Sequence, residues 1–134
     1  MKSPIHHMSV IRYYDDKPWD NKIVLNPAWE DVETAVRQMD NYYFPIVQLF
    51  LSEDPEAEDT FNIIGGKGRF ALLHFMGYWQ YEDPDGDDTE ASLWESDQGY
   101  YCKEKNILTD IEKVLRITRK FFETGSYENL DNTE

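Results

Sequence analysis

The chain has 134 residues, of which 15% are aromatic and 30% are charged, and its formal net charge is -14 at pH 7. This length suits one domain with its own core, and so many aromatic residues argue against an intrinsically disordered chain. No segment approaches the roughly 20 apolar residues of a transmembrane helix, and the opening segment lacks a signal-peptide pattern. The single cysteine, Cys102, fits a reducing compartment. We therefore expect a cytoplasmic protein with one domain over residues 1–134 and loose tails at 1–8 and 128–134.

The negative charge is concentrated in the middle of the chain. Residues 38–102 contain 14 acidic residues and only two basic ones, Lys67 and Arg69. Binding to nucleic acid or to a membrane is not expected, because phosphate contacts need clustered lysine and arginine. Crowded carboxylates repel one another and weaken folding slightly, so the excess either keeps the protein soluble or faces a positively charged partner.

The first elements in chain order are two strands. Alternating apolar residues over residues 9–14 predict a strand, residues 15–18 predict a turn, and residues 22–25 predict a short second strand that can pair with the first.

A helix is predicted next, over residues 27–39. Asn26 followed by Pro27 is typical of a helix start, because asparagine caps free amide groups and proline is tolerated at the first helical position. Apolar residues then recur at helical spacing, so this helix should lie on the sheet with Trp29 as a core residue.

The following segment predicts a strand and a hairpin. Residues 45–51 form an apolar strand, and residues 52–60 form an exposed acidic loop. Two apolar runs, residues 61–64 and 70–76, are joined at residues 65–68. Glycines there tolerate positive φ, which favours a tight turn in a central hairpin.

Beyond this hairpin lies the densest acidic stretch, residues 82–90, with an Asp-Gly pair at its turn. Two weaker strands are predicted around residues 91–95 and 99–103.

The last helix begins with a capping-box pattern, Thr109 and Glu112, and Gly125 is its predicted stop. About six short strands and two helices predict an α+β fold. We expect a two-layer arrangement with a mostly antiparallel sheet and both helices on one face.

The usual catalytic motifs are missing from the sequence. His74 and Cys102 could form a nucleophile pair, although a core histidine and a buried thiol are the simpler explanation. The glycine-rich turn passes into a strand and not into the helix of a phosphate-binding loop. The aspartates from Asp83 to Asp88 lack the glycine and glutamate of an EF-hand, and paired glycosidase carboxylates are recognised only in space. We therefore expect no catalytic residue, no metal site and no cofactor.

A binding surface is the remaining interpretation. Dense carboxylates speed the encounter with a basic protein, and large aromatic residues give such a complex its lifetime. The candidate contact residues are two sets of carboxylates and the aromatic residues that border the second: Asp54, Glu56, Glu58, Asp59, Trp79, Tyr81, Glu82, Asp83, Asp85, Asp87, Asp88 and Trp94. Trp79 and Trp94 could instead fill the core of the sheet.

Three short patterns occur in order along the chain: NPAWEDV at residues 26–32, IIGGKGRF at residues 63–70 and FFETG at residues 121–125. Together they resemble the first-numbered immunity-protein family of bacterial polymorphic toxin systems. Members of this family are small cytosolic inhibitors encoded beside a toxin, often a nucleic-acid deaminase. The resemblance implies a non-enzymatic protein that binds and neutralises a cognate toxin with a basic surface.

Two other functions stay open. One is a small ligand-binding domain or enzyme with its site near His74 and Cys102, which a deep pocket with perturbed titrating groups would favour. The other is an assembly module that associates with itself through a sheet edge or an aromatic face.

Overall fold

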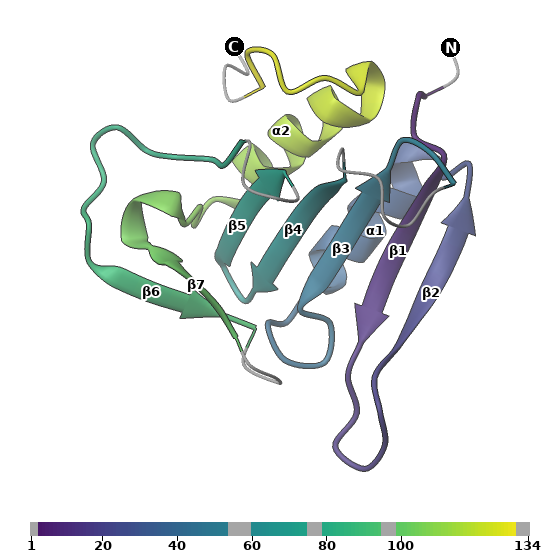
Figure 1. The fold of residues 1–134 in the computed structure, drawn as a ribbon, viewed down its shortest axis with the longest axis horizontal. Coiled ribbons are helices and arrows are strands. Elements are labelled where there is room, and N and C mark those ends of the chain that lie inside the picture. Colours follow the sequence, from purple (N-terminus) through teal and green to yellow (C-terminus); the bar gives the residue numbers. More distant parts are fainter. Residues whose placement is uncertain (1–2, 54–59, 75–78, 95–98, 131–134) are drawn as a thin grey trace.

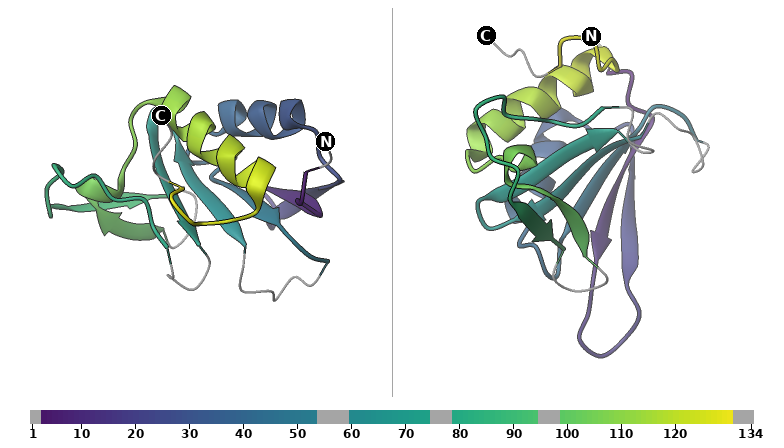
Figure 2. Two further views of the ribbon diagram at one scale, coloured as in Figure 1. Left: turned by 90° about the horizontal axis from the view of Figure 1, so that it is seen from above. Right: turned by 60° about the vertical axis from the view of Figure 1, so that its left-hand side comes forward.

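The computed structural model describes residues 3–53, 60–74, 79–94 and 99–130 (Figure 1). Its five-stranded antiparallel sheet has the strand order β2-β1-β3-β4-β5, and two α-helices cover one face (Figure 2). This is the α+β fold predicted from the sequence. Its elements are β1 (His7–Arg12), β2 (Asp20–Leu25), α1 (Trp29–Gln38), β3 (Ile46–Phe50), β4 (Phe61–Gly66), β5 (Arg69–His74), β6 (Glu90–Leu93), β7 (Tyr100–Lys103), the short 3-10 helix η2 (Glu104–Asn106) and α2 (Ile111–Thr124).

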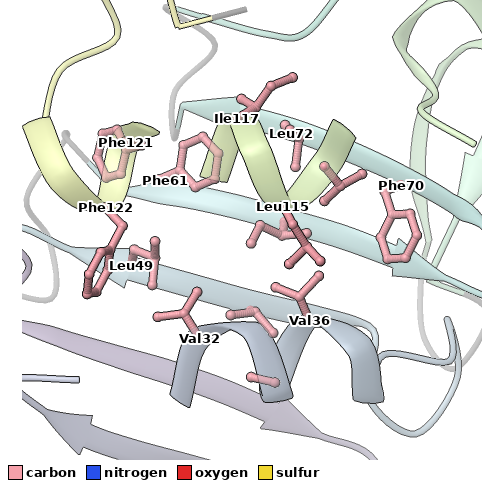
Figure 3. Close-up of a cluster of buried hydrophobic side chains, with 14 of the residues drawn as sticks. Val32, Val36, Leu49, Phe61, Phe70, Leu72, Leu115, Ile117, Phe121 and Phe122 are labelled. Carbon is pink, nitrogen blue, oxygen red and sulfur yellow. The ribbon is translucent and has the colours of Figure 1, made fainter. Parts of the chain in front are cut away.

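The main core lies between the helices and the sheet (Figure 3). Successive side chains of a strand point to opposite faces, so every second residue of β3, β4 and β5 faces the helices. Phe61 of β4 stacks on Phe121 of α2 with ring centroids 4.8 Å apart, and both side chains are fully buried. From α1, Val32 and Val36 lie one turn apart and enter the same core.

A smaller core lies on the opposite face of the sheet. The alternate residues Ile46, Ile64 and Ala71 point away from the helices and pack against Leu93 of β6 and Ile107. Strands β6 and β7 form a separate two-stranded antiparallel sheet. The hairpin therefore covers the β5 end of a face that the helices leave open.

The helix starts differ from the predicted ones. Helix α1 begins at Trp29 with Ala28 as its N-cap, and the Asp31 carboxylate accepts the hydrogen bond of the Ala28 N–H at 2.9 Å. Asn26 lies outside the helix with a φ of 48°. In α2 the cap is Asp110, whose carboxylate accepts from the N–H of Glu112 at 3.0 Å. The predicted caps, Asn26 and Thr109, are therefore wrong.

The hairpin of β4 and β5 is confirmed, but β5 lies at the edge of the sheet and not at its centre. Its two-residue turn consists of Lys67 and Gly68, and the strand pairing continues through Gly66. A Cβ atom on Gly66 would lie 2.5 Å from the backbone nitrogens of Asp40 and Asn41. Glycine at position 66 thus lets the segment after α1 cross close to the sheet.

The ends of the described chain pack more closely than the sequence suggested. Ile5 and Met8, which we assigned to a loose tail, are buried in the main core, and so is Leu130. Gly125 ends α2 as predicted, with a φ of 66° and its N–H bonded to the carbonyl of Phe121 at 2.7 Å.

Candidate functional site

The densest group of described carboxylates lies beside β5, at the end of the sheet farthest from β2 (Figure 1). We call this region the acidic lobe and define it as residues 82–93 and 100–106. It consists of the loop after β5, the strands β6 and β7, and η2. Its described residues include seven acids and two bases, Lys103 and Lys105.

The carboxylates of the loop face solvent. Its exposed acidic residues are Glu82, Asp85, Asp87, Asp88 and Glu90, and Asp83 is half-buried. Fully solvated carboxylates at neutral pH keep their charge, and so many of one sign within one loop produce a local negative potential.

The loop backbone is tied to η2 by three hydrogen bonds. The N–H of Asp83 donates to the carbonyl of Lys105 at 2.7 Å, and the N–H of Lys105 donates to the carbonyl of Asp87 at 3.0 Å. The N–H of Glu104 donates to the carbonyl of Thr89 at 2.8 Å. These bonds hold the acidic residues in a defined arrangement although the loop has no regular secondary structure.

Two aspartates also close turns within the loop. The Asp83 carboxylate accepts from the N–H of Asp85 at 2.9 Å, and the Asp83 carbonyl accepts from Gly86 at 3.0 Å, as expected for the Asp-Gly turn. The Asp87 carboxylate accepts from the N–H of Thr89 at 2.9 Å. A Cβ atom on Gly86 would lie 2.6 Å from the Cβ of Lys105, so glycine lets the turn rest directly on η2.

Lys105 is the cation at the centre of the lobe. Its Nζ lies 2.8 Å from the Asp88 carboxylate and 3.6 Å from that of Glu82. The hydrogen bond and charge of Lys105 hold the pKa of Asp88 below its ordinary value, and the same bond raises the pKa of Lys105. Because both carboxylates are exposed, the pairs add little stability, although Lys105 itself is half-buried. Lys103 and Lys105 cannot neutralise the seven acidic residues of the lobe, so the lobe keeps a negative excess.

Two of the three aromatic residues that border the acidic stretch in the sequence, Trp79 and Tyr81, turn towards the helices. Residues 79–81 run back along β5, where His74 N–H donates to the Trp79 carbonyl at 2.8 Å. This pairing directs Tyr81 into the main core, where its hydroxyl accepts from Lys113 Nζ at 3.2 Å. Trp79 is half-buried and packs on Phe61. The expected position of Tyr81 at a contact surface is therefore corrected to the interior, and Trp79 packs half-buried against the same core.

The third aromatic residue, Trp94, joins the acidic lobe to the sheet. It is half-buried, packs against the smaller core and lies edge-on to Tyr13 with ring centroids 5.9 Å apart. Its backbone N–H donates to the side-chain oxygen of Asn41 at 2.7 Å. Trp94 thus positions the lobe and leaves little of its ring for a partner.

Tyr101 is the exposed aromatic residue of the lobe, and the sequence analysis missed it. Its side chain is 77% exposed on β7, opposite Ser92 of β6. The neighbouring Tyr100 points to the smaller core, and burial raises its pKa to about 12. The alternation of residues 100–103 could have identified Tyr101, because a strand that packs on one face exposes every second side chain.

Most of the other acidic stretch lies outside the described residues. Asp54, Glu56, Glu58 and Asp59 lie outside the described residues, so their contribution stays a prediction. Glu53 is exposed and follows β3, whereas the lobe follows β5, and β4 lies between these strands.

His74 and Cys102 lie on opposite sides of the sheet. His74 lies on the helix side, where its ring meets the edge of Tyr127 with centroids 4.4 Å apart. Cys102 packs against the smaller core, and burial raises the pKa of its thiol. A raised pKa reduces the reactive thiolate, and the two residues do not form the nucleophile pair considered from the sequence. In the part of the chain that the structure describes, no three His, Cys, Asp or Glu side chains form a metal-binding group.

The chain has no match among protein-family models, curated proteins or solved structures. None of the described helices is long and apolar enough to cross a membrane. The site must therefore be interpreted from its own geometry.

Proposed function

We propose that this chain is a non-enzymatic immunity protein that binds and neutralises a cognate bacterial toxin, one that acts on nucleic acid. The acidic lobe would be its contact surface. The observation that carries the proposal is the loop of exposed carboxylates, which hydrogen bonds hold in place outside the helix-and-sheet body.

The charge of the lobe fits such a partner. A toxin that acts on nucleic acid needs a basic cleft, because phosphate binding depends on lysine and arginine. Carboxylates on the inhibitor can occupy the places of the phosphates and steer the encounter, which raises the association rate at low salt. Tyr101 adds an exposed aromatic side chain of the kind that prolongs the lifetime of a complex.

The hydrogen bonds within the loop also favour binding. A loop that is already ordered loses less conformational entropy when it meets a partner. The bonds to Glu104 and Lys105 and the turns at Asp83 and Asp87 supply this order.

The resemblance to the immunity-protein family supports the same function from another side. Its three patterns fall at the start of α1, on the β4–β5 hairpin and at the end of α2. These are scaffold positions outside the lobe. The three patterns therefore support the proposal that the chain is an immunity protein, and the charge of the lobe supports a partner with a basic surface.

The test is charge reversal in the loop. The variant combines Asp85→Lys and Asp88→Lys with Asp83→Asn and Asp87→Asn, since asparagine keeps the side-chain oxygen that closes each turn. Its association with the toxin domain encoded in the neighbouring reading frame should be at least about tenfold slower at low salt. Stopped-flow kinetics and protection of cells that express the toxin measure this effect.

The matched control makes an equal change of net charge away from the lobe. Exposed acids on other elements are Asp16, Glu30 and Glu128, and replacing all three with lysine raises the net charge by the same six units. This control should retain most of the association rate. Equal association rates for the loop variant and the wild type at low salt would show that the lobe is not part of the interface.

A further inference from the structure

Strand β2 is an unpaired edge in the described structure. It is the outermost strand of the sheet, and no described strand pairs with its outer side (Figure 1). Unpaired N–H and C=O groups on an edge can pair with another chain, and proteins usually protect such edges. The acidic lobe lies at the other end of the same sheet (Figure 2).

The residues at this edge are unusually apolar. Trp19, Ile23 and Leu25 are 53%, 48% and 65% exposed, and they are three of the five exposed large hydrophobic residues in the described chain. Ile23 and Leu25 occupy alternate positions of β2, so they belong to one face, and Trp19 lies one residue before the strand begins. That face points away from the helices, because the intervening residues Asp20, Lys22 and Val24 line the groove beside α1.

The same face is uncharged across three strands. Its residues on β1, β2 and β3 are His7, Ser9, Ile11, Asn21, Ile23, Leu25, Ile46, Gln48 and Phe50. Burial and the neighbouring His6 lower the pKa of His7, which therefore stays neutral at pH 7. In a chain with 30% charged residues, such depletion is typical of the centre of a protein–protein interface.

We infer that β2 pairs with β2 of a second copy of this chain, antiparallel and around a two-fold axis through Asn21. Two residues, one from each copy, then lie opposite each other when one precedes Asn21 by as many positions as the other follows it. Asp20 of each copy lies opposite Lys22 of the other, and Trp19 lies opposite Ile23. Unlike charges and apolar side chains directly across a strand pair are both stabilising.

Two other symmetric registers near the centre of β2 fit less well. An axis through Lys22 would place the two lysines opposite each other, and like charges in that position are destabilising. An axis through Ile23 would place each Lys22 opposite the apolar Val24 of the other copy. The charges of β2 therefore favour the register centred on Asn21 over these two.

A second copy is also the occupant that the overall charge favours. Two chains of net charge -14 repel each other, so they can meet only where their acidic groups are far apart. Pairing at the β2 edge keeps the acidic lobes at the two distant ends of a continuous sheet, and the acidic residue of the strand itself, Asp20, lies opposite Lys22 of the other copy. A cationic partner has no electrostatic reason to choose this uncharged face.

Two complementary charge variants test the pairing. Lys22→Asp places aspartates opposite each other, and Asp20→Lys places lysines opposite each other. Each variant alone should weaken dimerisation at least about tenfold relative to the wild type. An equal mixture should recover the dimer, because every lysine then faces an aspartate of the other chain. Sedimentation equilibrium of each sample, with one chain fluorescently labelled in the mixture, measures the association.

Controls separate pairing from folding. Lys67→Asp changes the charge equally in the exposed turn between β4 and β5 and should dimerise as the wild type does. Asp20→Lys also removes a hydrogen bond from the Tyr14 hydroxyl, so circular dichroism must show that each variant is folded. If a charge variant is not folded, Ile23→Ser takes its place and should weaken the dimer. A wild-type chain that stays monomeric at high salt, or variants that dimerise as tightly as the wild type, would overturn the inference.

Discussion

The two ends of the sheet present opposite kinds of surface. Beyond β5, the acidic lobe carries carboxylates on an irregular loop that is ordered by backbone hydrogen bonds. At β2, a regular strand presents apolar side chains on an uncharged face. Charge acts over about 8–10 Å at physiological salt, whereas backbone pairing and apolar contacts need touching surfaces. The first end is therefore suited to attracting a partner and the second to pairing with one, and a single core supports both.

A substitution in the main core, which supports both ends of the sheet, should have the largest effect on stability. Phe121→Ala deletes a fully buried ring of α2 that stacks on Phe61 of β4, and we expect a loss of about 3–5 kcal/mol in the free energy of unfolding. Small domains have about 5–15 kcal/mol in total, so the proposed toxin binding and the inferred dimerisation should both decline. Urea unfolding measures the loss of stability.

The surface substitution Tyr101→Ala is the control for this experiment. Tyr101 is exposed, so its removal should change stability by no more than about 0.5 kcal/mol and affect only the acidic lobe. A Phe121→Ala protein that kept full stability would contradict the assignment of this ring to a common core.

The second prediction separates the two ends. Asn41→Gly removes the side-chain oxygen that accepts from the Trp94 N–H, while glycine tolerates the φ of 68° at this position. Leaving the amide without its acceptor should cost about 1–3 kcal/mol. Hydrogen exchange should accelerate in β6 and β7 and stay unchanged in β1 and β2.

Asn41→Asp is the matched variant, because it keeps both a side-chain acceptor and tolerance of positive φ. Hydrogen exchange in β6 and β7 should be slower in Asn41→Asp than in Asn41→Gly. Equal acceleration in β1 and β2 would mean that the acidic lobe does not open separately from the rest of the sheet.

The two ends also differ in how far the sequence predicted them. Local signals were sufficient for the β4–β5 hairpin and for the stop of α2 at Gly125, because a glycine turn and a helix end depend on neighbouring residues. The carboxylates of the lobe were equally visible, since acidic side chains rarely enter a core. The same local reasoning misplaced the cap of α1, where the chain makes a further turn at Asn26 before the helix begins.

The aromatic residues could not be placed by local signals. Trp79 and Tyr81 stand next to acidic residues in the sequence, but their pairing with β5 turns them towards α2. This pairing joins segments across a loop, and no pattern within either segment specifies it. The apolar edge at β2 was missed for the same reason, because the exposure of Ile23 and Leu25 depends on which strand ends the sheet.

The third prediction has the smallest effect and compares one carboxylate from each end. Near β2, hydrogen bonds from the hydroxyls of Tyr43 and Tyr42, at 2.6 and 2.8 Å, hold the pKa of Asp15 below its ordinary value. In the acidic lobe, Lys105 lowers the pKa of Asp88. Salt screens an exposed ion pair but not a hydrogen bond from a neutral hydroxyl. Carboxyl NMR titrations at low and high salt should therefore show the pKa of Asp88 rising with salt, while that of Asp15 changes little.

The sign of the accompanying stability change follows from linkage. Because the pKa of Asp15 is lower in the folded protein than in the unfolded chain, its contribution to stability is present above the ordinary pKa of 3.8. That contribution disappears as the pH falls through the lowered value. Asp15→Asn, and Tyr42→Phe combined with Tyr43→Phe, should therefore flatten the acid side of the stability curve at any salt concentration. If high salt raised the pKa of Asp15 in the wild type as much as it raised that of Asp88, the tyrosine hydroxyls would not be the cause, and the contrast between the two carboxylates would fail.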